Sequence, residues 1–207
     1  MDTKRNKYYS IIALTLGDGY LQYSHNNIKG KACIDIAHKA ECKDFIEYKS
    51  HILTSNNFNN HVVLKTKQNG NHVYRVSSKY YQLIGDVKRK LYPKGEKVFL
   101  KRWIKYLDAW ALAILWMDDG CLCRQKKKRI DGSIYEYQFG VIATQSFDYQ
   151  SQCNIINWLK TFNIDATINH SKDKYRIRMS RNNLKRLIEV VAPYVKEIPS
   201  MVYKITI

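Results

Sequence analysis

The chain has 207 residues, of which 45% are hydrophobic and 13% aromatic. This composition excludes a disordered tail, and a chain of this length buries enough surface to fold without disulfides or metal clips. Its 35 lysines and arginines outnumber its 18 aspartates and glutamates, which leaves a net charge of +17. Such an excess of positive charge predicts a polyanionic partner, and nucleic acid is the commonest one.

The apolar segments are too short to cross a membrane. The most apolar run covers residues 109–117, whereas a spanning helix needs about 20 residues. No signal-peptide pattern follows the charged residues 1–7, and neither the five cysteines nor the six scattered histidines show metal-ligand spacing. We therefore expect an intracellular protein with free thiols and no membrane partner. A mitochondrion and the cytoplasm of a bacterium or a phage host are equally compatible with this pattern.

The chain contains an internal repeat. Residues 11–19, IIALTLGDG, resemble residues 112–120, LAILWMDDG, and the acids Asp18 and Asp119 are 101 positions apart. The segment YRV at 74–76 returns as YRI at 175–177 with the same offset. Two matches at one offset predict a duplicated half, with one domain at 1–97, a second at 98–207 and a linker near 92–103.

The same order of elements is expected in each half. An apolar helix leads to each Asp-Gly pair, and two strands, a helix, two more strands and a last helix follow it. The later segments are expected at 20–24, 32–37, 41–53, 62–67, 72–77 and 79–91, and again at 121–126, 135–143, 148–162, 166–170, 175–179 and 181–191. The fold class is therefore α+β, with the pattern αββαββα occurring twice and the last helix ending near Pro193.

Alternating side chains at 174–180 predict a basic sheet surface. Arg176 and Arg178 alternate with Tyr175, Ile177 and Met179, so the arginines point away from the core. A solvated face would explain one such strand, but the net charge favours a nucleic-acid surface. The basic run RQKKKR at 124–129 lies in an expected hairpin and favours phosphate contacts. The residues expected to bind DNA are Arg75, Arg124, Lys126, Lys128, Arg176 and Arg178.

The two Asp-Gly pairs carry the candidate chemistry. Helices as apolar as those before them are buried on all sides, and in a duplicated chain we expect them to pack against each other. Asp18 and Asp119 each end a helix, where the dipole disfavours a carboxylate, while Gly19 and Gly120 suit the left-handed position that stops a helix. One Asp-Gly pair would be an ordinary turn, but two at the repeat offset favour a cation site. Oxygen ligands of this kind favour Mg²⁺, which bridges to phosphate.

These segments resemble the paired signature of the LAGLIDADG homing endonucleases, in particular the monomeric, intron-encoded type with two motifs in one chain. Residues 142–147, IATQSF, resemble the family's T-Q-S-F segment, and residues 198–204, IPSMVYK, resemble its C-terminal segment. The resemblance covers nearly the whole chain. It implies two antiparallel four-stranded sheets that form a saddle on the DNA major groove, with the motif helices at the centre. It also implies Mg²⁺-dependent, staggered double-strand cleavage of a long asymmetric target, which promotes intron homing.

The resemblance implies roles for the motif residues. Asp18 and Asp119 would bind the metal, with the backbone of Gly17 and Asp118 as further candidates. Some members of the family have lost cleavage, although loss of a motif acid usually marks them and both acids remain here. An RNA-binding maturase with intron RNA as its partner and a cleavage-inactive DNA-binding regulator are therefore the alternatives. Trp116 departs from the pattern because it is bulky where close helix packing is expected.

Three further residues are implied as catalytic. Lys97 and Lys204 would lie near the scissile phosphates, with Lys94 and Lys101 as rivals of Lys97. Gln145 would orient water or metal in the second half. Its counterpart in the first half falls near residues 38–39, His-Lys, which breaks the pattern. This asymmetry suggests that non-identical sites cut the two strands.

Overall fold

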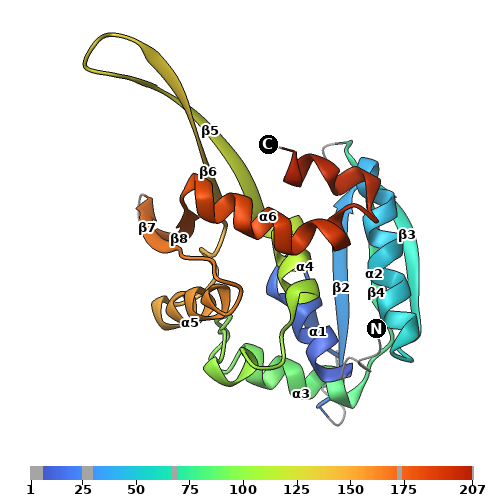
Figure 1. Ribbon diagram of the computed structural model, residues 1–207. Helices are drawn as coiled ribbons and strands as arrows, with labels where there is room; N and C mark the ends of the chain where they lie inside the picture. The colour runs from blue at the N-terminus through green and yellow to red at the C-terminus, as the bar shows by residue number, and fades with distance from the viewer. Residues whose placement is uncertain (1–6, 25–29, 67–69, 172–173, 207) are drawn as a thin grey trace. The chain divides into compact units, whose positions relative to one another are not determined.

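The structure is a computed structural model, and it describes residues 7–24, 30–66, 70–171 and 174–206. The described elements follow the order αββαββα twice, which confirms the predicted architecture (Figure 1). The chain forms two compact units, Met1–Gly95 with Lys196–Tyr203 and Glu96–Val195 with Lys204–Ile207. No helix among the described residues has both the length and the apolar character that crossing a membrane would need.

The first unit is a four-stranded antiparallel sheet covered by helices. Its strands are ordered β1-β2-β4-β3, and α2 and α3 pack on them while α1 packs on α3. Seven residues of α1, from Ser10 to Leu16, are buried, as expected for a helix without a polar face. The elements are α1 (Lys7–Leu16), β1 (Tyr20–Tyr23), β2 (Ala32–Lys39), η2 (Ala40–Cys42), α2 (Lys43–Ser55), β3 (Asn60–Thr66), β4 (His72–Ser78) and α3 (Gln82–Leu91).

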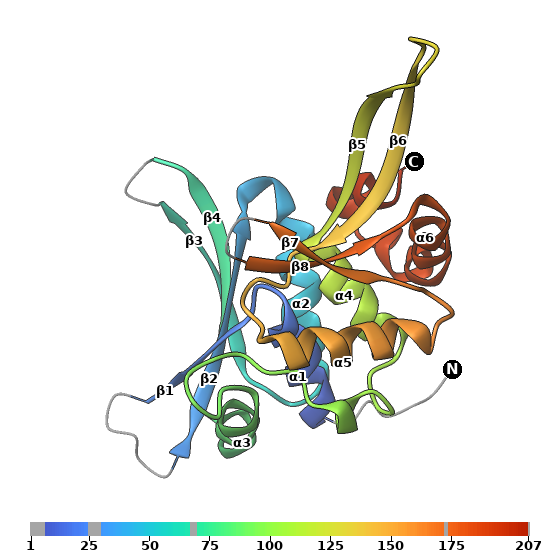
Figure 2. The ribbon, with the colours of Figure 1, turned by 90° about the vertical axis from the view of Figure 1, so that its left-hand side faces the viewer.

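The second unit repeats this plan with strand order β5-β6-β8-β7. Its hairpin of β5 and β6 extends well beyond the rest of the sheet (Figures 1 and 2). The turn of that hairpin contains an Asp-Gly pair, as expected, and Gly132 has φ +86°. The elements are η3 (Lys101–Trp103), α4 (Ala109–Asp119), β5 (Gly120–Lys128), β6 (Ile134–Ile142), α5 (Tyr149–Lys160), β7 (Thr167–Ser171), β8 (Lys174–Met179) and α6 (Arg181–Val195). The residues of η4 (Pro199–Ile205) are divided, with 199–203 in the first unit and 204–205 in the second.

Two helix ends differ from expectation. Helix α1 ends at Leu16, so Asp18 lies in the turn after the helix. Helix α6 continues through Pro193 to Val195, although the proline was expected to end it. Proline removes one hydrogen bond from a helix, but here Val191 and Val195 are both fully buried, and this burial offsets the lost bond.

Strand register matches the two units residue by residue. Tyr20 of β1 pairs with Asp35 of β2, and Cys121, which takes the place of Tyr20 after the second Asp-Gly pair, pairs with Val141 of β6. Val141 is therefore the counterpart of Asp35. The connection from the first to the second strand is five residues longer in the second unit than in the first. At the end of the second strand, residues 38 and 39 therefore correspond to residues 144 and 145. Between β4 and β8, which pair with β2 and β6, equivalent residues are again 101 positions apart.

Candidate active site

The motif acids occupy equivalent places in the two units. Asp18 lies between α1 and β1, and its side chain is 44% exposed. Asp119 is the last residue of α4 and is half-buried, and its carbonyl oxygen accepts a hydrogen bond from the Ala143 N–H at 2.9 Å. Each acid directly precedes a glycine and a strand. Both carboxylates therefore project from the short link between a buried helix and the first strand of a sheet.

The two motif glycines are needed for space rather than for a left-handed backbone. The expected left-handed conformation was wrong, because Gly120 has φ −75° and ψ 144° and Gly19 also lacks a positive φ. A Cβ on Gly19 would lie 2.2 Å from the Leu14 carbonyl oxygen. On Gly120 it would lie 2.3 Å from ring carbons of Trp116. Any larger residue would push the acid away from the preceding helical turn.

Lys204 lies next to the second motif. Its Nζ donates a hydrogen bond to the Gly120 carbonyl oxygen at 2.6 Å, one residue from Asp119. The indole N–H of Trp116 donates to the Lys204 carbonyl oxygen at 3.0 Å. Trp116 is fully buried, so the bulky residue that departed from the family pattern holds the backbone of the candidate catalytic lysine.

Lys97 lies beside the IATQSF segment. Its backbone pairs with that of Phe147 in a short parallel bridge, and its Nζ is 5.2 Å from the centre of the Phe147 ring. Lys97 is buried, whereas its rivals Lys94 and Lys101 are exposed. Gln145 lies two residues before Phe147 in an exposed turn. The second unit thus brings Lys97 to the segment that contains Gln145.

Two residues near Asp18 were missed in the sequence. His38 Nδ1 lies 3.6 Å from the Asp18 carboxylate, and His38 Nε2 lies 2.9 Å from Lys49 Nζ. Lys49 is fully buried, with its Nζ 4.1 Å above the ring of Phe45. Because an ammonium group can only donate, it makes Nε2 the acceptor, and the Nδ1 proton then faces Asp18. Lys49, His38 and Asp18 form a polar chain, with His38 2.9 Å from Lys49 on one side and 3.6 Å from the first acid on the other.

Two features of the sequence indicated this polar chain of side chains. IAHK at 36–39 matches IATQ at 142–145, which places His38 where the second half has Thr144. Lys49 lies four residues after Phe45 and four before Leu53, on the buried face of its helix. A lysine on that face needs a polar partner. In the second unit, the Thr144 hydroxyl instead donates to the Gln152 side chain at 3.0 Å.

The predicted DNA-binding residues lie on different faces. Ile177 and Met179 are buried against the helices, so Arg176 and Arg178 lie on the open face of the second sheet. Arg178 lies 4.1 Å above the ring of Phe139. By strand alternation Lys127, which belongs to the expected basic run at 124–129 but was not singled out, shares that face. Arg124, Lys126 and Lys128 project from the other side of β5, and Arg124 is 3.9 Å from Glu136.

Comparison with known proteins identifies the family. Residues 10–187 match the model of the LAGLIDADG DNA endonuclease family. The chain belongs to this family. It is also 26% identical over 189 residues to the intron-encoded endonuclease ai4 of Dictyostelium discoideum, which covers 89% of this chain and 93% of that protein.

Solved structures support the LAGLIDADG fold. The homing endonuclease I-WcaI, solved bound to its DNA recognition sequence, has a TM-score of 0.75 at 21% identity, over 99% of this chain and 88% of the other. The LAGLIDADG meganuclease I-AabMI, bound to uncleaved DNA, has a TM-score of 0.59 at 9% identity, over 91% and 84% of the two chains. At these identities the likeness is one of fold.

Proposed function

We propose that this LAGLIDADG protein is a site-specific DNA endonuclease that makes staggered double-strand breaks at a long asymmetric target and so promotes intron homing. The observation that carries the proposal is the equivalent placement of two carboxylates, Asp18 and Asp119, with the His38 imidazole near the first and the Lys204 ammonium group hydrogen-bonded beside the second. Two complete motifs in one chain support a monomer. The intron-encoded relative supports a place inside the cell, in a mitochondrion, a bacterium or a phage host.

The residues around the two acids fit a hydrated divalent cation, for which Mg²⁺ is our proposal. Both carboxylates retain solvent exposure, which leaves room for the waters that Mg²⁺ keeps. The backbones of Gly17 and Asp118 precede the acids and could add oxygen ligands. The bound ion would activate water and stabilise charge on the phosphate.

The remaining chemistry falls to the chain's own side chains. Lys204, hydrogen-bonded beside Asp119, would place a fixed positive charge near the developing charge on the phosphate. The buried Lys97 would act in the same way, with Gln145 orienting the attacking water. In the first unit, the Nδ1 proton of His38 would hold the Asp18 carboxylate in one orientation. The two sites therefore cut with different supporting groups.

A randomised duplex DNA library tests the activity. The protein is incubated with the library in Mg²⁺, and the ends of the products are sequenced. Paired, staggered ends at one long site are the expected result, and chelation with EDTA should abolish them. A parallel binding experiment with intron RNA covers the maturase alternative. If the protein binds intron RNA and cleaves no DNA, the maturase function would replace the proposed one. If it binds DNA in Mg²⁺ without cleaving it, the protein would be a DNA-binding regulator.

A further inference from the structure

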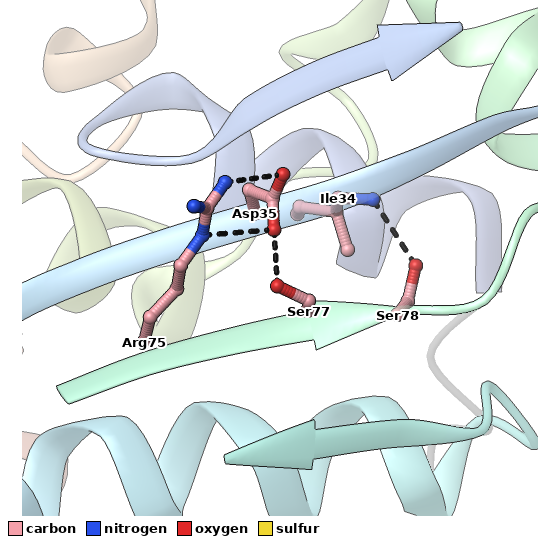
Figure 3. A network of polar contacts seen from close by, with 5 residues as sticks. All are labelled: Ile34, Asp35, Arg75, Ser77 and Ser78. Carbon is pink, nitrogen blue, oxygen red and sulfur yellow. Dashed lines mark hydrogen bonds and ion pairs between the residues drawn. The ribbon is translucent and has the colours of Figure 1, made fainter. Parts of the chain in front are cut away.

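An ion pair lies on the open face of the first sheet. Arg75 of β4 places Nη2 2.8 Å from Asp35 Oδ2 of β2, and its Nε donates to Oδ1 at 3.2 Å (Figure 3). The Ser77 hydroxyl donates to the same Oδ1. Ser77 lies directly opposite Asp35 in the register of β2 and β4, so the Arg75 guanidinium reaches diagonally across the two strands.

The two partners differ in exposure. The Asp35 side chain is 11% exposed, whereas that of Arg75 is 34% exposed. The carboxylate occupies the Nε edge of the guanidinium, and the Nη end is what remains for a second partner. Five donors in a planar fork make this possible, because one edge can be held while the other stays directed outward. Asp35 thus fixes the orientation of a partly exposed arginine.

The second sheet lacks this arrangement. By register, Val141 takes the place of Asp35, Arg176 that of Arg75 and Arg178 that of Ser77. The acid and hydroxyl of the first unit are therefore replaced by a valine and a second arginine. Arg178 lies over the rings of Phe139 and Tyr137. At equivalent positions, the first sheet carries a neutral, oriented pair and the second carries two positive charges.

We propose that Asp35 is a specificity-determining residue that holds Arg75 as a reader of one guanine, with the Nη end directed at the O6 and N7 acceptors of the base. The proposal rests on the proposed action on DNA. An arginine paired with a carboxylate gains little from a phosphate, because the acid repels the phosphate. It gains more from a base edge, since the orientation needed for bidentate bonding is already set. Among the residues that the structure describes, neither Arg176 nor Arg178 forms an ion pair, so both contribute mainly through charge.

The test is DNA binding in Ca²⁺, without cleavage. A target selected from a randomised duplex library by the unmodified protein is compared with its single-base variants at several salt concentrations. Arg75→Ala should weaken binding roughly tenfold to a hundredfold through one G·C pair, with little change in the salt slope. Asp35→Val, which reproduces the second unit, should relax the preference at the same base pair. It should also steepen the slope of log K against log salt by about 1, because Arg75 is freed for phosphate.

Matched variants separate orientation from charge and from folding. Asp86→Asn removes an exposed acid that pairs with Arg89 on α3, a helix that packs on the sheet face opposite to Arg75, and should leave base preference unchanged. If Asp35→Val does not fold, Asp35→Asn tests the inference in its place, because it keeps the size of the side chain and removes its charge. The preference should weaken in that variant too.

Two results would overturn the inference. One is an unchanged base preference in the folded Asp35 variant. The other is an Arg75→Ala variant that weakens binding to all sequences equally and lowers the salt slope by about 1. A different outcome, in which the unmodified protein selects no DNA at all, would instead refute the proposed function and remove the basis of the inference.

Discussion

Lys204 and Gly120 are 84 positions apart in the chain, and the side chain of one donates a hydrogen bond to the backbone carbonyl of the other at 2.6 Å. This bond brings an ammonium group to the residue that follows Asp119. The Trp116 indole holds the same lysine through its carbonyl oxygen. A second-motif acid, a glycine without room for a side chain and a C-terminal lysine thereby form one local arrangement, which makes the site testable by single substitutions.

Replacing either motif acid should separate cleavage from binding. In Asp18→Asn and Asp119→Asn a neutral amide takes the place of a carboxylate and holds Mg²⁺ poorly. We expect each variant to lose double-strand cleavage and to keep its affinity for the target in Ca²⁺, because the basic sheet faces are unchanged. Gel assays of cleavage and of binding measure the two properties. Full double-strand cleavage by either variant would show that the acid is not a metal ligand.

The lysines should affect rate more than affinity. Lys204→Met and Lys97→Met each remove one positioned charge, which costs on the order of 3 kcal/mol of transition-state stabilisation, roughly a hundredfold in rate. Single-turnover cleavage measures this loss, and Lys94→Met and Lys101→Met are the exposed controls. An inactive Lys94 or Lys101 variant beside a fully active Lys97 variant would move the assignment to that control position.

The polar chain behind Asp18 should matter for catalysis and little for folding. Lys49→Met keeps the aliphatic packing of a fully buried side chain and removes the donor to His38 Nε2. Loss of such an orienting partner typically costs about tenfold to a hundredfold in activity. We expect slower cleavage with a melting temperature close to that of the unmodified protein. Lys43→Met, on the exposed side of the same helix, is the control and should cleave normally. Equal cleavage rates for the two variants would show that Lys49 contributes to packing and not to catalysis.

Enlarging the second motif glycine should strain the site. In Gly120→Ala the added methyl meets both the ring and the carbonyl oxygen of Trp116 within 2.4 Å. Overpacking of this kind costs about 1–3 kcal/mol. Because Trp116 also holds Lys204, cleavage should fall together with the free energy of unfolding in urea. A variant as stable and as active as the parent would mean that the helix and strand can separate here without cost.

The paired thiols on β5 should react at different rates. Burial, followed by the adjacent Cys121 thiol, raises the pKa of Cys123 to about 11. Only the thiolate is nucleophilic, so at pH 9 Cys123 remains mostly protonated and unreactive, and its reactivity should rise as the pH approaches 11. Iodoacetamide labelling followed by peptide mass analysis should show the exposed Cys121 modified first. Cys123 should stay slow in Cys121→Ser, because burial is the larger cause. Rapid labelling of Cys123 at pH 9 would contradict the raised pKa.

The architecture could be predicted because it depends on short-range patterns. The apolar runs before Asp18 and Asp119, the two-residue alternation at 174–180 and the repeat offset are each visible within a few neighbouring residues or by comparing the halves. These patterns predicted the element order and the basic face that contains Arg176 and Arg178, whereas the two four-stranded sheets were implied by the resemblance to the LAGLIDADG family. They also located both motif acids.

The partners of those residues depended on the three-dimensional fold. Asp35 meets Arg75 across 40 positions, and His38 lies between Asp18 and Lys49, through strand register and helix packing that no local pattern encodes. The basic run at 124–129 gave one expected surface, but strand pairing divides it between two faces, with Lys127 on the side of Arg178. A shift of one residue in register would exchange these faces. Local sequence therefore determined which residues could act, and long-range pairing decided which of them act together.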